Sequence, residues 1–129
     1  LIFILKENMI KSIKLPVSAP FHCGLMNKAT QIMSKELKEL NFIQSENKLI
    51  SNVTAKEISS TDELRDLLIK QIENRVRWRE SVINMINNDV NHFIEIGPGK
   101  VLSGLVKRIN KEVKISTINN QGDIEGLEI

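Results

Sequence analysis

A histidine at the exit of a proline-bracketed turn is the residue in this chain best placed to do chemistry. Beta-prone residues lead into the segment Pro16-Val-Ser-Ala-Pro-Phe-His22-Cys-Gly-Leu-Met26, and an amphipathic helix is expected to follow it. A rigid support of this kind can aim an imidazole into a cleft, as a general base requires. His22 also suits capping of that helix or a polar niche, and the residue pattern leaves this alternative open.

Other nucleophile and ligand types are sparse. Cys23 follows His22 directly, but adjacent side chains usually point in different directions, which disfavours a Cys/His pair. His92 stands at the start of a predicted strand, and we expect it at the strand edge. With two histidines, one cysteine and no clustered ligand spacing, no metal site is expected. No Gly-x-Ser-x-Gly motif occurs, so a base is present without an activated serine.

The segment Gly97-Pro98-Gly99-Lys100 resembles a phosphate loop only superficially. A phosphate loop ends in Gly-Lys-Ser/Thr, and Val101 takes the place of the hydroxyl residue here. We interpret the segment as a tight strand-to-helix turn, where a small anion could still meet the helix N-terminus. The positive side of the helix is either a solvated face or a dock for an acidic protein, and it comprises Lys100, Lys107, Arg108 and Lys111.

Helices that alternate with short buried strands are expected to position these residues. The apolar periodicity predicts helices over 1–8, 23–40, 60–72, 78–88 and 101–109, and strands over 13–18, 49–53, 92–96 and 113–118. Ser60 and Glu63 have the capping-box spacing that opens a helix. The alternation predicts an α/β fold with a mostly parallel sheet. The tail from Asn119 is expected to be polar and loosely held.

Composition narrows the classes of function. The chain has 129 residues, of which 41% are apolar and 26% charged, so it forms one domain at most. A net charge of +2 and 4% aromatic residues argue against a nucleic acid partner. The apolar start is far shorter than the roughly 20 residues that span a bilayer, so no membrane partner is expected. The single cysteine favours a reducing compartment, and we expect a cytoplasmic protein.

Several further motifs follow the histidine segment in order. They are Ile50-Ser-Asn-Val-Thr-Ala55, Leu64-Arg-Asp-Leu-Leu-Ile-Lys-Gln71, Val76-Arg-Trp78, Ser81-Val82 and Ile94-Glu-Ile-Gly-Pro-Gly-Lys-Val-Leu-Ser-Gly-Leu105. Together they resemble bacterial-type malonyl-CoA:acyl carrier protein transacylases over about residues 13–118. The resemblance implies the C-terminal part of an α/β-hydrolase-like large acyltransferase subdomain over 13–118. It also implies the end of a small ferredoxin-like subdomain over 1–12 and a polar tail over 119–129.

The resemblance implies a chemistry that needs no cofactor. Enzymes of this family move a malonyl group from coenzyme A to a serine, and then to the phosphopantetheine thiol of acyl carrier protein. His22 matches the general base, and Gln71 matches the glutamine that orients it, mainly through its backbone carbonyl. A hydrogen bond to one ring nitrogen fixes the tautomer and leaves the other nitrogen free to accept a proton. Acyl carrier protein and the coenzyme A thioester are therefore the expected partners.

The chain also departs from the family. The serine elbow and the arginine that pairs with the malonate carboxylate would both lie upstream of Leu1, and the chain starts within an apolar run without Met. We therefore expect a fragment that is inactive alone and that needs an N-terminal half, which a separate chain could provide. Arg75 stands where the family usually has proline. The alternatives are a catalytically dead fragment that binds acyl carrier protein, or a piece of a polyketide synthase-type acyltransferase.

Overall fold

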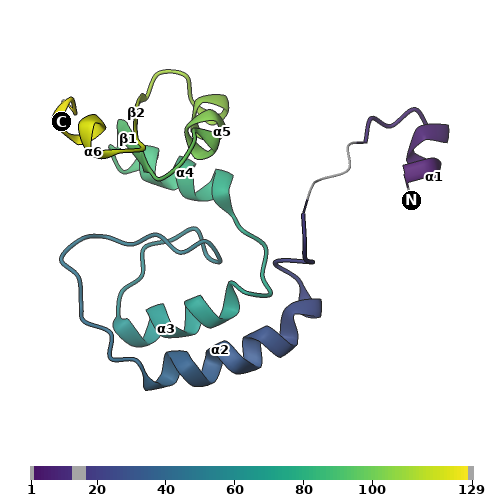
Figure 1. The fold of residues 1–129 in the computed structure, drawn as a ribbon, viewed down its shortest axis with the longest axis horizontal. Coiled ribbons are helices and arrows are strands. Elements are labelled where there is room, and N and C mark those ends of the chain that lie inside the picture. The colour runs from purple at the N-terminus through teal and green to yellow at the C-terminus, as the bar shows by residue number, and fades with distance from the viewer. Residues whose placement is uncertain (1, 13–16, 128–129) are drawn as a thin grey trace.

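The fold comes from a computed structural model, which describes residues 2–12 and 17–127. Its helices are α1 (Ile2–Glu7), α2 (Asn27–Glu39), α3 (Thr61–Lys70), α4 (Trp78–Asn87), α5 (Val101–Ile109) and α6 (Gln121–Glu125). The strands are β1 (His92–Ile96) and β2 (Lys114–Ile118), and a short 3-10 helix, Gly24–Met26, precedes α2. Helices α2 and α3 lie side by side, α4, α5 and the strands gather in a second region, and α1 lies apart from both (Figure 1).

The second region is built around a parallel pair of strands. His92 of β1 pairs with Lys114 of β2, and the register runs on to Ile96 opposite Ile118. Helix α5 connects the strands and packs on both, while α4 packs on α5. The buried cluster consists of Val82, Val106 and Val113, with Trp78, Met85, Ile86, Phe93, Ile109 and Ile115 packed against it. This arrangement confirms the predicted α/β class with a parallel sheet.

Helices α2 and α3 share a much smaller apolar contact, with Leu37 and Leu67 as the buried residues of the two helices. Polar contacts add to it. Arg65 of α3 donates from Nε to the Leu37 carbonyl at 3.1 Å and from Nη2 to the Leu40 carbonyl at 3.3 Å. Its guanidinium also lies 5.3 Å from the centroid of the Phe42 ring. The last carbonyls of a helix have no partner within it, and Arg65 supplies donors to two of those at the end of α2.

Helix α3 begins where the capping signal predicted. The Ser60 hydroxyl accepts a hydrogen bond from the Glu63 amide at 3.1 Å. The Glu63 carboxylate accepts hydrogen bonds from the Ser59 amide at 2.8 Å and from the Ser59 hydroxyl at 2.6 Å. In a full capping box it would instead accept from the amide of Ser60. The Ser59 hydroxyl and amide lower the pKa of Glu63. The helix ends at Lys70, which leaves Gln71 as its C-cap.

The predicted strand over 49–53 is wrong. Ile50 makes only an isolated bridge with Glu57. The Ser51 hydroxyl accepts from the amide of Val53 at 3.1 Å, and Ala55 has a φ of 58°. A side-chain oxygen that captures nearby amides competes with strand pairing, so a tight turn forms here. Most of the strand predicted over 13–18 lies outside the described residues, and Val17 and Ser18 are not in a strand.

The polar tail expected from Asn119 contains a short helix that was not predicted. Asn120 caps α6, because its side chain accepts from the Asp123 amide at 3.3 Å while the Asp123 carboxylate accepts from the Asn120 amide at 3.2 Å. The Asp123 carboxylate also accepts from the amide of Asn119 at 2.8 Å. This reciprocal pair starts a short helix, which packs against β2.

Candidate active site

The imidazole of His22 stands on an exposed turn directly before the 3-10 helix that leads into α2. The backbone of His22 has a φ of 61°, in the left-handed region that non-glycine residues rarely adopt. This conformation costs about 1–2 kcal/mol. Contacts around the turn must therefore hold it, and the ring they present is open to solvent.

One hydrogen bond sets the tautomer of the neutral His22 ring. His22 Nδ1 lies 2.9 Å from the backbone carbonyl oxygen of Gln71. Because a carbonyl only accepts, the neutral imidazole carries its proton on Nδ1 and keeps the lone pair on Nε2. Such a ring can accept a proton from a hydroxyl or thiol that approaches Nε2. The expected contact with the Gln71 backbone is thus present, and the catalytic roles of the two residues stay a prediction.

Two further residues of this site were not singled out from the sequence. Asn27, at the start of α2, donates from Nδ2 to Glu73 Oε1 at 3.2 Å. The bond runs between the same two segments that His22 and Gln71 connect. No spacing rule joins residues so far apart in the sequence, so no pattern could have revealed the pair.

The other nucleophile and ligand candidates are engaged elsewhere. The Cys23 thiol donates to the carbonyl of Pro20 at 3.2 Å, within the turn. His92 opens β1, and its Nε2 lies 2.9 Å from the Ser116 hydroxyl, which confirms a place at the strand end. In the part of the chain that the structure describes, no group of three His, Cys, Asp or Glu side chains could hold a metal ion.

The glycine segment forms the expected turn from β1 to α5. Gly97 and Gly99 have φ values of 133° and 96°, which favour glycine. The carboxylate of Glu95 accepts from the Leu102 amide at 3.1 Å and from the Ser103 amide at 2.7 Å. The chain's own carboxylate therefore occupies the N-terminus of α5, the place where the sequence left room for a small anion.

Glu95 is held in its charged form by these neighbours. The pKa of Glu95 is lowered first by the Ser103 hydroxyl, then by the Ser103 amide and the Leu102 amide. By hydrogen-bond geometry the Ser103 hydroxyl has no partner, so the amides of Leu102 and Ser103 are the donors that the carboxylate contacts. A charged Glu95 thus stabilises the start of α5.

The four basic residues around α5 have different surroundings. Lys107 Nζ donates to the Val113 carbonyl at 3.2 Å, which ties α5 to the start of β2. Arg108 lines a cavity of about 500 Å³ between α4 and α5, together with Trp78 and Arg75. Lys100 and Lys111 are exposed at the two ends of α5. Their role as a partner-binding surface stays a prediction.

Arg75, which takes the usual place of proline, does not prevent the turn after α3. Its guanidinium lies 3.1 Å from the carboxylate of Glu80 in an exposed ion pair. The amide of Arg77 donates to the Asn52 carbonyl at 2.8 Å, which connects this turn to the loop before α3.

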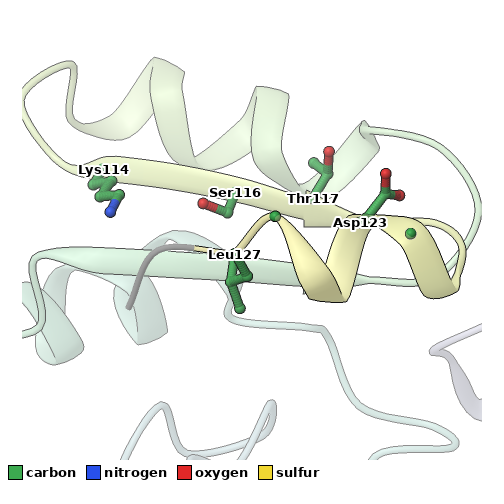
Figure 2. A pocket seen from close by; sticks show the side chains of 7 residues that line it. Lys114, Ser116, Thr117, Asp123 and Leu127 are labelled. Atoms are coloured by element: carbon green, nitrogen blue, oxygen red, sulfur yellow. The ribbon is translucent and has the colours of Figure 1, made fainter.

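A cavity of about 430 Å³ lies between β2 and α6 (Figure 2). Its lining consists of Lys114, Ser116, Thr117, Gly122, Asp123, Gly126 and Leu127. The Asp123 carboxylate is used in the cap of α6, and the Ser116 hydroxyl contacts His92. The side chains of Asp123 and Ser116 in this cavity thus serve local structure. Among the described residues, no helix is both long and apolar enough to cross a membrane.

Comparison with known proteins places this geometry in context. No protein-family model matches the chain. A malonyl CoA-acyl carrier protein transacylase of Bacillus subtilis (strain 168) is 40% identical over 121 residues, which are 93% of this chain and 38% of that protein. The crystal structure of an acyl-carrier-protein-S-malonyltransferase from Bartonella henselae matches with a TM-score of 0.88 and 39% identity, over 97% of this chain and 40% of that one.

A third similar structure is a complex of a type II PKS acyl-carrier protein with its malonyl-transacylase. It matches with a TM-score of 0.80 and 34% identity, over 86% of this chain and 36% of that one. The chain therefore spans about two-fifths of the length of the relatives it matches. The resemblance seen in the sequence is confirmed: the chain is homologous to part of the malonyl-CoA:acyl carrier protein transacylases and shares their fold over that part.

Proposed function

We propose that this homologue of part of a malonyl-CoA:acyl carrier protein transacylase carries the general-base half of a malonyl transfer site. The reaction would take malonyl from malonyl-CoA to phosphopantetheinyl acyl carrier protein, as in fatty acid biosynthesis, without a cofactor. Similarity to malonyl CoA-acyl carrier protein transacylases over 93% of the chain supports the reaction class. In this proposal, the segment matched here is the C-terminal part of such an enzyme.

The hydrogen bond from His22 Nδ1 to the Gln71 carbonyl is the observation that supports the role most directly. With Nδ1 protonated, Nε2 can take the proton of a serine hydroxyl, and the serine oxygen then attacks the malonyl thioester. The proton passes to the departing coenzyme A thiolate. The same nitrogen then takes the proton of the phosphopantetheine thiol, whose sulfur attacks the malonyl-serine ester, and returns that proton to the departing serine oxygen.

In this proposal the nucleophilic serine comes from outside these 129 residues, because they contain no Gly-x-Ser-x-Gly segment. The proposal therefore includes a source for the remaining three-fifths of the enzyme, either a separate chain or a longer polypeptide. We also propose that the 129 residues alone transfer no malonyl group. Measurable transfer by the purified chain alone would contradict this part of the proposal.

A hybrid enzyme tests the base assignment. In it, this chain replaces the matching segment of the Bacillus subtilis relative, and malonyl transfer to acyl carrier protein is measured. His22→Ala should lower kcat/KM by at least about 100-fold, since a positioned base contributes that much or more. His92→Ala is the matched control, because His92 lies in the second region and contacts Ser116. Unchanged transfer in His22→Ala would overturn the assignment.

A second function, binding of acyl carrier protein without catalysis, is favoured by the exposed positive charge on and beside α5. The residues concerned are Lys100, Lys107, Arg108 and Lys111. One similar solved structure holds an acyl-carrier protein with its malonyl-transacylase, which supports such a partner. A titration of the chain with acyl carrier protein should show binding that weakens as salt rises. No binding at any salt concentration would exclude this second function. Tighter binding to the acyl carrier protein of fatty acid synthesis or to that of polyketide synthesis would indicate which of the two the chain serves.

A further inference from the structure

Two hydrogen bonds join the turn that carries His22 to the end of α3. One runs from the His22 ring to the Gln71 carbonyl at 2.9 Å, and the other runs from Asn27 Nδ2 to Glu73 Oε1 at 3.2 Å. The first involves a ring that can rotate away into solvent. The second joins the first residue of α2 to the turn just after Gln71, so it acts on the backbone that carries the ring.

The surroundings of the second bond fix its direction. Gln31 Nε2 donates to Asn27 Oδ1 at 2.8 Å, so Nδ2 of Asn27 is the atom turned toward the Glu73 carboxylate. The other carboxylate oxygen of Glu73 faces Gly24, where a Cβ would lie 4.0 Å from it. The carboxylate thus spans the start of the 3-10 helix and the start of α2, immediately after His22.

His22 needs such support because of its backbone. A φ of 61° is strained for a histidine and persists only where neighbouring structure holds it. The His22–Gln71 and Asn27–Glu73 hydrogen bonds are both exposed, so water competes for each and two such bonds hold the turn better than one. We propose that Asn27 and Glu73 are positioning residues, whose hydrogen bond holds the His22 turn against the end of α3 and so keeps Nδ1 on the Gln71 carbonyl. The catalytic meaning of this rests on the proposed function, whereas the positioning itself does not.

The tautomer of His22 is a direct measure of this positioning. The chain has only two histidines, so nitrogen NMR of the full 129-residue protein can follow His22 and His92 separately. In the unaltered chain, we expect the His22 signals of a protonated Nδ1 and an unprotonated Nε2. In Asn27→Ala or Glu73→Ala, the ratio of the two tautomers should fall by about 2- to 10-fold, the equilibrium change that corresponds to one net hydrogen bond.

Matched variants separate positioning from a general loss of structure. Glu73→Gln keeps an oxygen that accepts from Asn27, so it should restore the tautomer ratio if geometry rather than charge is responsible. Gln31→Ala removes the neighbouring bond to Asn27 but leaves the Glu73 contact, and it should change the ratio least. The His92 signals should stay constant throughout. The double variant with Ala at both positions should be no worse than either single one, because the two residues act through one bond.

The outcomes distinguish this proposal from the proposed function. An unchanged His22 tautomer in both Ala variants, with His92 constant, would overturn the positioning role. If the tautomer shifts as expected and the hybrid enzyme loses transfer in parallel, with kcat lowered and KM for malonyl-CoA kept, both proposals stand. If the tautomer shifts while His22→Ala keeps full transfer, the positioning role stands and the base assignment fails.

Discussion

Each of the two regions of the chain is stabilised internally by a different kind of contact. In the region of α4, α5 and the strands, Val82, Val106 and Val113 are 0%, 3% and 6% exposed and meet in one cluster. The pair of α2 and α3 buries only Leu37 and Leu67, and side-chain hydrogen bonds such as those of Arg65 add to this contact. The proposed base, His22, belongs to the region of α2 and α3.

The difference has a physical consequence for the site. Apolar burial is strong but has no direction, so it stabilises a region without orienting one ring. Hydrogen bonds are individually weak but directional, and the imidazole of His22 needs direction. The two regions also have separate reporters, because Trp78 is the only tryptophan and packs on the apolar cluster, while His22 reports on the other region. Trp78 and His22 therefore allow the two regions to be followed separately.

The largest effect is expected from Val82→Asp. A carboxylate at a fully buried position has no partner there, and such changes cost more than about 4 kcal/mol. We expect the near-ultraviolet circular dichroism of Trp78 to be lost. Val101→Asp is the matched control, since Val101 is 71% exposed at the start of α5 and should tolerate the same change. A native Trp78 signal in Val82→Asp would show that the cluster is not the core of its region.

Arg65→Met should lower the stability by a smaller amount, and only in the α2–α3 pair. The carbonyls of Leu37 and Leu40 lose a charged donor, which should cost about 1–3 kcal/mol. Urea unfolding followed by the NMR signals of His22 should shift to lower urea. Arg79→Met, at an exposed arginine of α4, should leave the same transition in place.

Arg65→Met also tests whether the two regions are independent. If Trp78 fluorescence keeps its urea midpoint while the His22 transition moves, the regions unfold separately. If both transitions move together, the chain unfolds as one unit, and the comparison then describes two kinds of contact within a single cooperative structure.

The elements that the sequence predicted best are those with strong local signals. The cap at Ser60 and the glycines at 97 and 99 placed the start of α3 and the turn into α5, because each signal acts within a few residues. The strand expected over 49–53 failed because the Ser51 hydroxyl captures nearby amides. Helix α6 was missed because five residues carry little periodicity, and its start depends on the single pair Asn120 and Asp123.

The candidate site was only partly predictable. His22 stood out by its place in the turn, but its contact with the Gln71 carbonyl came from the family resemblance and not from any spacing. The bond between Asn27 and Glu73 depends on how distant segments pack. Side-chain contacts of this kind carry no sequence period, so only the folded chain reveals them.

Ser60→Ala should weaken the region of the proposed base slightly. Loss of the hydroxyl leaves the Glu63 amide without its partner, and an N-cap of this kind contributes about 1 kcal/mol. The urea midpoint of the His22 transition should therefore fall by less than in Arg65→Met. Ser60→Gly is the control, because glycine at an N-cap costs only a few tenths of a kcal/mol. An unchanged midpoint in Ser60→Ala would mean that the hydroxyl bond contributes nothing.

The smallest effect concerns pH, and it is expected in both regions. Glu63 before α3 and Glu95 before α5 both have a lowered pKa in the folded chain, the first through Ser59 and the second through Ser103 and Leu102. A carboxyl with a lowered folded pKa stabilises the fold above its unfolded value of about 4.3, and this stabilisation is lost as the pH falls through the folded pKa. Stability should therefore be flat near pH 7 and should decline below about pH 4.3.

Single substitutions assign this acid sensitivity to a region. Glu95→Gln should reduce the decline followed by Trp78, because an amide oxygen still accepts from the α5 amides but no longer titrates. Glu63→Gln should do the same for the decline followed by His22, measured as the urea midpoint at each pH. If Glu95→Gln reduced both declines, the charge at α5 would stabilise the whole chain. The directional contacts around His22 would then depend on the apolar region, and the two regions would form one cooperative structure.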